Sequence, residues 1–174
     1  MHVYADNAAT TKMSAAAIAA MLPCYDMAYA NPSSLHTPGQ EAKEILEDAR
    51  ARVAAVLGCE AREIYFTSGG SEADNQAIIS AARFGARKNK KHIISTAFEH
   101  HAVLHTLNKL EKEGFEVTLL DVKTNHNITA QQVKDAIRPD TCLVTVMYAN
   151  NEIGSILPIA EIGAVCKEAG GPFH

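Results

Sequence analysis

The sequence predicts an α/β domain with a mostly parallel sheet flanked by helices. Apolar residues make up 47% of the 174 residues, which is enough for a buried core. Short segments with strand character alternate with longer segments of helical periodicity, and turn residues separate them. Strands that alternate with helices of this length are typical of βαβ units, in which the strands are parallel.

The first part of the chain is predicted to be mainly helical. Residues 3–5 have the character of a short strand, and an alanine-rich segment over 14–27 predicts a helix that ends before the turn at 31–34. Residues 40–57 carry an apolar stripe at helical spacing, so they predict an amphipathic helix. Gly58 follows this segment as its stop signal.

The remaining elements alternate between strand and helix. The predicted strands lie at 63–66, 92–96, 115–120 and 141–147. The predicted helices lie at 71–84, ended by Gly85, at 101–113, ended by Gly114, at 129–137, opened by a Thr-x-x-Gln capping box, and from Pro158 to about 169. Pro158 is expected in the first turn of its helix. Residues 170–174 resemble a turn that enters a further strand.

Charge and composition give no support for several classes of partner. The net charge is -4 and the sequence pI is about 6.0, whereas nucleic acids and acidic membranes attract basic patches. No apolar run approaches the roughly 20 residues that span a bilayer, and the N-terminus lacks the pattern of a signal peptide. We therefore expect a cytoplasmic protein. Its 4 cysteines are far apart and predict no disulfide framework.

The loop over 67–70, between a predicted strand and a predicted helix, carries the first functional signal. Gly69 and Gly70 let the backbone approach a ligand closely, and the N–H groups at the start of the next helix favour an anion such as phosphate. Ser71 can cap that helix and donate its hydroxyl to the same anion. An ordinary turn with a serine cap would show the same pattern. The motifs of a P-loop and of a dinucleotide-binding fingerprint are both absent here.

Glu99, His100 and His101 follow the predicted strand at 92–96, at the carboxyl end where open α/β sheets bind their ligands. An imidazole there can stack on a flat cofactor or transfer protons near neutral pH. A polar helix cap is the simpler alternative. His101 and His105 also have the i,i+4 spacing of a zinc site, but no third ligand lies near them in the sequence, which argues against a metal.

Asn150, Asn151 and Glu152 follow the predicted strand at 141–147 in the same way. Their amides can donate to a phenolate or carboxylate oxygen of a ligand. Turn chemistry is the alternative, since asparagine and Gly154 are good turn residues. Because each of these polar loops follows a predicted strand, all of them can line one edge of the sheet.

Together these motifs resemble the NifS/IscS-type cysteine desulfurases, which are PLP-dependent enzymes of fold-type I in the aminotransferase class V family. The matching segments follow one another in the family's order and extend over almost the whole chain. They are DNAATT at 6–11, NPSSLHTPG at 31–39, YFTSGGSEADN at 65–75, EH at 99–100 and NNEIG at 150–154. The third segment has serine at 71 where the family has threonine.

The resemblance implies a role for each candidate site residue. Gly70 and Ser71 would hold the phosphate of pyridoxal 5'-phosphate (PLP). His100 would stack on the pyridine ring and assist proton transfers, so it is the expected catalytic residue. Asn151 would bind the 3-oxygen of the cofactor and lie near the substrate carboxylate.

The resemblance also implies that residues after His174 would complete the site. In the family these are an aspartate that pairs with the pyridine nitrogen, a glutamine, the lysine that binds PLP covalently, the cysteine that takes up sulfur and an arginine for the substrate carboxylate. We therefore expect residues 1–40 to form an N-terminal segment, with a helix and a loop at the mouth of the active site. Residues 41–174 are expected to form a partial large, PLP-binding domain that stops before the covalent lysine.

The function implied is the N-terminal part of a PLP-dependent cysteine desulfurase, a transferase that converts L-cysteine to L-alanine and passes sulfur, through an enzyme persulfide, to iron–sulfur cluster or thio-cofactor assembly. This chain alone is expected to be inactive. A homodimer, the C-terminal portion and a scaffold or sulfur-acceptor protein are the expected partners, with no nucleic acid, membrane or metal. A non-catalytic dimerisation or acceptor-binding module, and another class V lyase or aminotransferase, remain alternatives.

Overall fold

The computed structural model describes residues 1–122 and 127–174 of the chain. The chain divides into two compact units, Met1–Phe66 and Thr67–His174, and each is described by itself. The sequence predicts a different division, into an N-terminal segment over 1–40 and a partial PLP-binding domain over 41–174. That division concerns function, and it stays a prediction. None of the helices in the described ranges is both long enough and apolar enough to cross a membrane.

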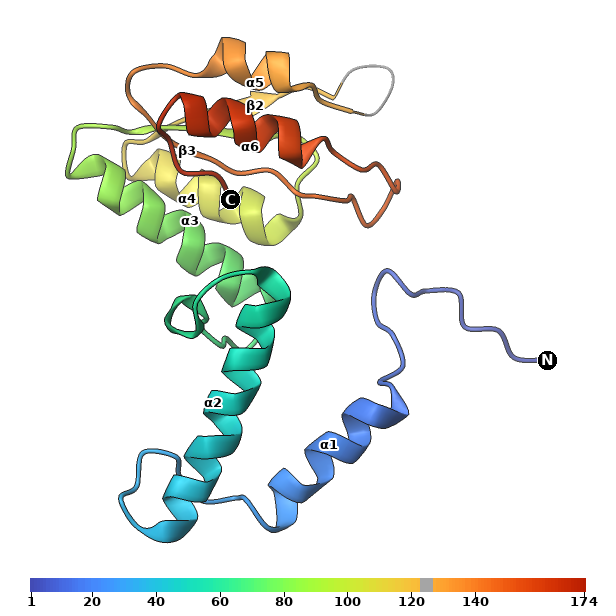
Figure 1. The fold of residues 1–174 in the computed structure, drawn as a ribbon. Helices are drawn as coiled ribbons and strands as arrows, with labels where there is room; N and C mark the ends of the chain where they lie inside the picture. The colour runs from blue at the N-terminus through green and yellow to red at the C-terminus, as the bar shows by residue number, and fades with distance from the viewer. Residues whose placement is uncertain (123–126) are drawn as a thin grey trace. The chain divides into compact units, whose positions relative to one another are not determined.

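The first unit contains two helices and a short 3-10 turn, α1 (Ala15–Asp26), α2 (Thr37–Leu57) and η1 (Ala61–Glu63) (Figure 1). Helix α1 begins where the Ser14 side chain accepts a hydrogen bond from the Ala17 amide at 3.1 Å. Helix α2 begins earlier than predicted, because His36 caps it by accepting from the amide of Gly39. It ends at Gly58, whose φ of 70° is left-handed, as the sequence predicts.

Two predicted strands of the first unit are absent from the described structure. Residues 3–5 have no regular structure, and within 63–66 Glu63 ends η1 while 64–66 follow it without joining a ladder. The segment contacts a side chain instead: the Arg50 guanidinium donates to the carbonyl of Ile64 and lies 5.0 Å from the centre of the Phe66 ring. A strand pattern predicts a strand only where a neighbouring strand supplies the partner groups.

The second unit is built on a parallel sheet of β1 (His92–Thr96), β2 (Glu116–Leu120) and β3 (Thr141–Val144), in the order β2-β1-β3. The last residues extend this sheet, since Phe173 forms a parallel bridge to Val144 and the amide of His174 donates to the carbonyl of Val144 at 2.9 Å. The prediction that 170–174 turn into a further strand is therefore confirmed. Strand β3 ends earlier than the predicted 147.

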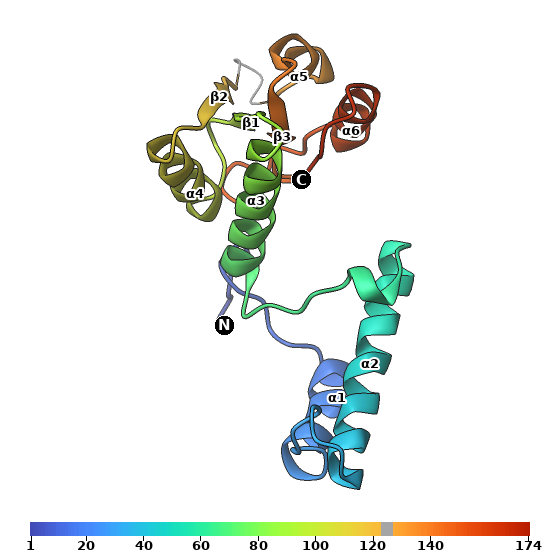
Figure 2. The ribbon, with the colours of Figure 1, turned by 90° about the vertical axis from the view of Figure 1, so that its left-hand side faces the viewer.

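Helices cover both faces of this sheet (Figure 2). Helices α3 (Gly70–Ala86) and α4 (His101–Lys112) pack on one face, around a core that includes Ile93 and Leu143. Helices α5 (Ala130–Ala136) and α6 (Ile159–Glu168) cover the other face, around Ile94 and Val144. Adjacent residues of one strand thus enter opposite cores, as the pleat of a strand requires. The predicted parallel α/β fold is confirmed.

Helix ends in the second unit agree with the sequence in part. The Thr129–Gln132 capping box at the start of α5 is confirmed. Pro158 is the N-cap of α6, outside the first turn where the sequence places it. Gly85 does not end α3 but lies inside it: a Cβ at this position would be 2.2 Å from the Cβ of Cys142, so glycine lets α3 pack closely on β3.

Candidate functional site

Two loops bound a cavity of about 280 Å³ at the carboxyl edge of the sheet. One loop follows β1 and the other follows β3, so the parallel topology brings them together. His100 comes from the first loop and Asn151 from the second. The complete lining is Ala97, Phe98, Glu99, His100, His101, Leu104, Asn150, Asn151, Glu152 and Ile153. Two of the residues predicted for the site therefore lie in one cavity.

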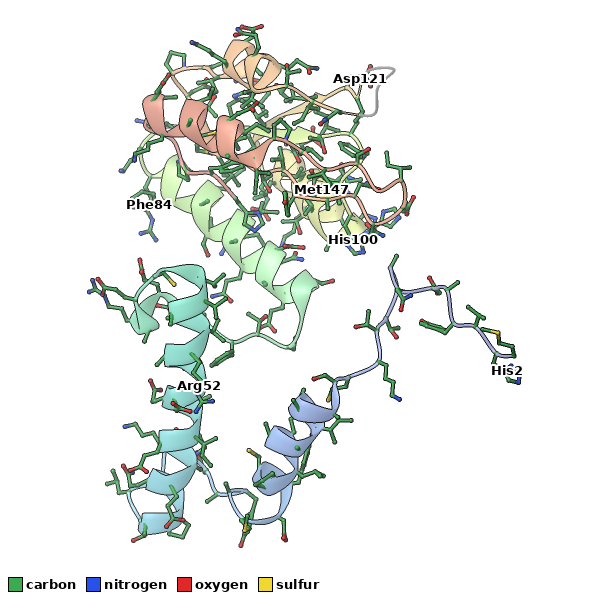
Figure 3. The ribbon with its side chains drawn as sticks, turned by 45° about the vertical axis from the view of Figure 1, so that its right-hand side comes forward. His2, Arg52, Phe84, His100, Asp121 and Met147 are labelled. Carbon is green, nitrogen blue, oxygen red and sulfur yellow. The ribbon has the colours of Figure 1, made fainter. Side chains whose placement is uncertain are left out.

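A second cavity of about 150 Å³ shares His100 with the first. Figure 3 shows His100 and Met147, which both line this cavity, at the same edge of the unit. Asp74 of α3 and His174 also line it, and their closest side-chain atoms lie 3.9 Å apart. The other ring nitrogen of His174 lies 2.9 Å from the Thr145 hydroxyl.

His100 is both a helix cap and a cavity residue, so the two interpretations of the sequence hold together. Its Nδ1 accepts a hydrogen bond from the amide of Ala102 at 3.1 Å, at the N-terminus of α4. A neutral imidazole with Nδ1 as acceptor carries its proton on Nε2. The exposed side chain can therefore present an Nε2 donor to a bound group.

Glu99, next to His100, is buried with a relative exposure of 6%. Its Oε1 accepts hydrogen bonds from the Thr96 hydroxyl at 2.6 Å and from the Met147 amide at 2.9 Å. Burial raises the pKa of this carboxyl, because the charged form loses water, while the two hydrogen bonds oppose that rise. Glu99 thus connects the ends of β1 and β3.

The adjacent amides Asn150 and Asn151 differ in their surroundings. Asn150 is buried, donates to the carbonyl of Phe98 at 2.9 Å and accepts from the amides of Glu152 and Ile153 at 2.8 and 2.9 Å. Asn151 is exposed and lines the larger cavity. The first amide shapes the loop, and the second is available to a ligand.

The N-terminus of α3 lies at the same edge of the sheet, because the other end of this helix leads into β1. Gly69 is its N-cap and supplies no side chain, and Gly70 and Ser71 form its first turn. The expectation that Ser71 caps the helix is therefore wrong. Among the described residues, no heavy atom lies within 4 Å of the position that a Cβ would take at Gly69 or Gly70. A ligand could therefore approach the backbone closely at these two glycines.

Side chains of the same segment hold this turn in place. Glu72 accepts hydrogen bonds from the amide and hydroxyl of Ser68 at 2.7 and 2.5 Å, and these bonds lower the pKa of its carboxyl. Asn75 donates to the carbonyl of Ser71 at 2.5 Å and accepts from the hydroxyl of Thr106 in α4. The N-terminal turn of α3 is therefore tied to α4, whose N-cap is His100.

The structure brings only part of the predicted site into one cavity. His100 and Asn151 line the larger cavity, whereas Gly70 and Ser71 lie outside its lining, at the start of α3. His101 and His105 stack with ring centres 5.3 Å apart. In the part of the chain that the structure describes, no group of three or more histidine, cysteine, aspartate or glutamate side chains is arranged to hold a metal ion.

Sequence reasoning missed the structural roles of Glu99, Asn150 and Asn75. All three lie in segments that the sequence singles out, but residue type alone does not separate a buried polar side chain from an exposed neighbour. A signal exists for Asn75, since it lies three positions before the buried Ile78 on α3 and so shares its inner face. Glu99 and Asn150 have no such periodic signal, because they lie in loops.

Known proteins match the chain over almost its whole length. A family model described as aminotransferase class-V matches residues 3–174. The cysteine desulfurase IscS of Methanosarcina thermophila is 48% identical over 172 residues, which make up 99% of this chain and 42% of that protein. The cysteine desulfurase IscS of Clostridium botulinum strain Hall is also 48% identical, over 99% of this chain and 43% of that protein.

Solved structures give the same result. A NifS-like protein superposes with a TM-score of 0.95 at 36% identity, and the match covers 100% of this chain and 48% of the chain of that protein. A structure of SspA in complex with cysteine superposes with a TM-score of 0.92 at 42% identity, over 98% of this chain and 49% of its own. The chain spans less than half the length of these relatives and matches the N-terminal part of their fold. The chain therefore belongs to the aminotransferase class-V family.

Proposed function

We propose that the protein is a PLP-dependent cysteine desulfurase, and that this chain supplies the N-terminal part of its PLP-binding domain. The observation that carries the proposal is the cavity that places His100 and Asn151 together at the carboxyl edge of a parallel sheet. The matched relatives named cysteine desulfurase, at 48% identity, support the choice of reaction. The similarity to a structure that holds cysteine supports the choice of substrate.

The residues present fit PLP. The start of α3 offers N–H groups beside two glycines with open space at their Cβ positions, which suits a phosphate. Gly70 and Ser71 would hold this phosphate, His100 would lie against the pyridine ring, and Asn151 would donate to the 3-oxygen. Bound PLP would supply an electron sink for negative charge that develops on the substrate.

The chain's own residues would bind the substrate and move a proton. His100 is the side chain placed to move a proton: while its Nδ1 accepts from the amide of Ala102 its Nε2 carries the proton, so Nδ1 would have to release that amide for Nε2 to take a proton. The Asn151 amide would orient the carboxylate of L-cysteine. The overall reaction would yield L-alanine and a persulfide, whose sulfur would serve iron–sulfur cluster or thio-cofactor assembly.

We also propose that residues 1–174 by themselves do not turn over cysteine. The family's covalent lysine, the aspartate for the pyridine nitrogen and the sulfur-accepting cysteine have no counterpart in this sequence. A homodimer and a sulfur-acceptor or scaffold partner are expected from the family resemblance. A non-catalytic module that binds an intact homologue, or a class V enzyme with another amino-acid substrate, are the alternatives.

The test is an assay of the full-length protein with L-cysteine and an added thiol, which reduces the persulfide and releases its sulfur as sulfide; alanine and sulfide are measured with and without added PLP. We expect alanine and sulfide in equal amounts, with turnover that depends on PLP. If cysteine gives no alanine but another amino acid is turned over, the result would favour another class V enzyme. A protein that neither binds PLP nor turns over any amino acid would favour the non-catalytic module.

A further inference from the structure

Two side chains connect the loops on either side of the larger cavity in a reciprocal way. From the loop after β1, Glu99 accepts a hydrogen bond from the amide of Met147 at 2.9 Å. From the loop after β3, Asn150 donates to the carbonyl of Phe98 at 2.9 Å. Each loop therefore holds the backbone of the other, and we name Glu99 and Asn150 the loop clamp.

Each member of the loop clamp is also fixed on its own side. Glu99 accepts from the Thr96 hydroxyl at 2.6 Å, at the end of β1. Asn150 accepts from the amides of Glu152 and Ile153 at 2.8 and 2.9 Å, which folds its own loop into a tight turn. Both residues are buried, with relative exposures of 6% and 7%. A buried hydrogen-bond network of this kind resists displacement, because breaking it leaves polar groups without partners.

The loop clamp lies one residue from each of the two exposed candidate site residues. His100 directly follows Glu99, and Asn151 directly follows Asn150; both line the cavity. A shift of either loop would change the spacing of the imidazole and the amide across that cavity. Misplacing a reacting group by about 1 Å can cost about 100-fold in rate.

We propose that Glu99 and Asn150 are positioning residues that set the spacing of His100 and Asn151. The proposal rests on the proposed function for the reaction that this spacing serves, but the clamp itself is a property of the described loops. Neither residue touches the substrate in this proposal, and each acts through its neighbour.

The chemistry of Glu99 separates positioning from proton transfer. Both of its hydrogen bonds end on one oxygen, Oε1, so an amide oxygen in the same place can accept them equally well. Glu99→Gln therefore keeps the clamp and removes only the ionisable group. If Glu99 were instead a proton donor or acceptor, glutamine could not replace it.

The experiment uses the full-length protein loaded with PLP and compares Glu99→Gln, Glu99→Ala and Asn150→Asp, with the exposed Glu111→Gln of α4 as control. Hydrogen exchange at the Met147 amide reports the clamp without any assay of activity. We expect exchange about tenfold faster in Glu99→Ala and close to wild type in Glu99→Gln. For cysteine turnover we expect kcat/KM to fall about 10- to 100-fold in Glu99→Ala and to stay within about threefold in Glu99→Gln.

Asn150→Asp keeps the acceptor for the amides of Glu152 and Ile153 but loses the donor to Phe98, so it breaks one bond of the clamp at constant shape. It should lower kcat/KM about tenfold, and it tests the proposal even if Glu99→Ala fails to fold. Loss of activity in Glu99→Gln equal to that in Glu99→Ala would overturn the proposal, as would unchanged exchange at Met147 in Glu99→Ala. A wild-type protein without cysteine turnover would contradict the proposed function, while the exchange measurement would still decide the clamp.

Discussion

At the residue scale, adjacent residues in the two loops have different roles: one side chain holds the loop in place, and the next is available to a ligand. All members of the pairs Glu99–His100 and Asn150–Asn151 line the cavity, but the first residue of each pair is buried and hydrogen-bonded, whereas the second is exposed. A loop residue that needs a defined position gains it most directly from an adjacent side chain that is held by the protein interior.

His100 allows the two roles of one side chain to be separated. Asparagine is a good helix cap but has no imidazole, so His100→Asn should keep the start of α4 while His100→Ala should lose the cap as well. We expect cysteine turnover to fall about 100-fold or more in both variants of the full-length protein. Thermal unfolding should show a loss of stability of about 1 kcal/mol for alanine and less for asparagine. Wild-type turnover in His100→Asn would exclude the imidazole from the reaction.

At the element scale, the sheet depends on a few close or polar contacts between strands and helices. Gly85 brings α3 against Cys142 of β3. His92, at the start of the central strand, is fully buried and lies 2.8 Å from the Thr118 hydroxyl of β2 and 2.7 Å from the Thr141 hydroxyl of β3. Both contacts lie at the end of the sheet opposite to the candidate site.

Two glycine substitutions should have opposite effects. Gly85→Ala introduces a Cβ that would lie 2.2 Å from the Cβ of Cys142, so we expect a loss of about 1–3 kcal/mol from overpacking. Gly163→Ala in α6 would contact the Phe173 ring at 3.4 Å, which is close to an ordinary contact, and alanine favours the helix by about 0.5–1 kcal/mol. Denaturant unfolding of the two variants checks the difference. Equal stabilities would contradict the close approach of α3 and β3.

His92 predicts a pH dependence of stability. Burial, with the nearby Arg138 charge as a smaller cause, lowers the pKa of this imidazole below its usual value of about 6.5. The unfolded chain then binds the proton more readily than the folded chain. Stability should therefore be complete above about pH 6.5 and fall as the pH falls below it, towards the lowered pKa.

A His92→Gln variant, which has a polar side chain without an ionisable group, should lose this part of the pH dependence. Unfolding free energies of wild type and variant between about pH 5 and 8 provide the comparison. Parallel pH curves for the two proteins would show that His92 does not titrate in this way.

At the scale of the whole molecule, the parallel topology collects residues far apart in the chain at one edge. The start of α3 and the loops after β1 and β3 are separated by tens of residues, yet each begins at the carboxyl edge of the sheet. A helix N-terminus, which favours anions, and a polar cavity thus lie at the same edge, as the proposed binding of PLP needs.

Removal of PLP should lower the stability of the full-length protein, because a ligand that binds only the folded state stabilises it. Ser71→Ala should weaken PLP binding by about 10-fold or more, since a hydrogen bond to a charged group contributes about 1.5–3 kcal/mol. Ser71→Thr, which keeps the hydroxyl, should bind as wild type does. The shift of the melting temperature with PLP concentration measures the PLP affinity of the wild type, of Ser71→Ala and of Ser71→Thr. An unchanged affinity in Ser71→Ala would remove Ser71 from the phosphate site.

Local patterns were sufficient for much of the fold. The alternation of strand and helix, Gly58 as the cap of α2 and the capping box of α5 follow from spacing and from residue type, and the structure confirms them. The apolar stripe correctly predicts helix α2, but Ile45, Val53 and Val56 on that stripe are exposed in the described structure. The strand predicted at 63–66 is wrong for a physical reason, since its partners are the side chain of Arg50 and not a neighbouring strand. Gly85 was predicted to end its helix but lies inside α3, against Cys142. Glycine serves both as a helix stop and as a close packing contact, so residue type alone does not separate the two roles.

The fold class, the alternation of strands and helices over residues 70–169 and the segments of the candidate site could be predicted from the sequence, because these depend on periodicity, turn chemistry and short motifs. The burial of Glu99 and Asn150 beside the exposed His100 and Asn151, in one common cavity, became visible only in the tertiary structure. The reason is that burial and hydrogen-bond partners are set by contacts across the sheet, between loops about fifty residues apart in the chain. No pattern within either loop contains that information.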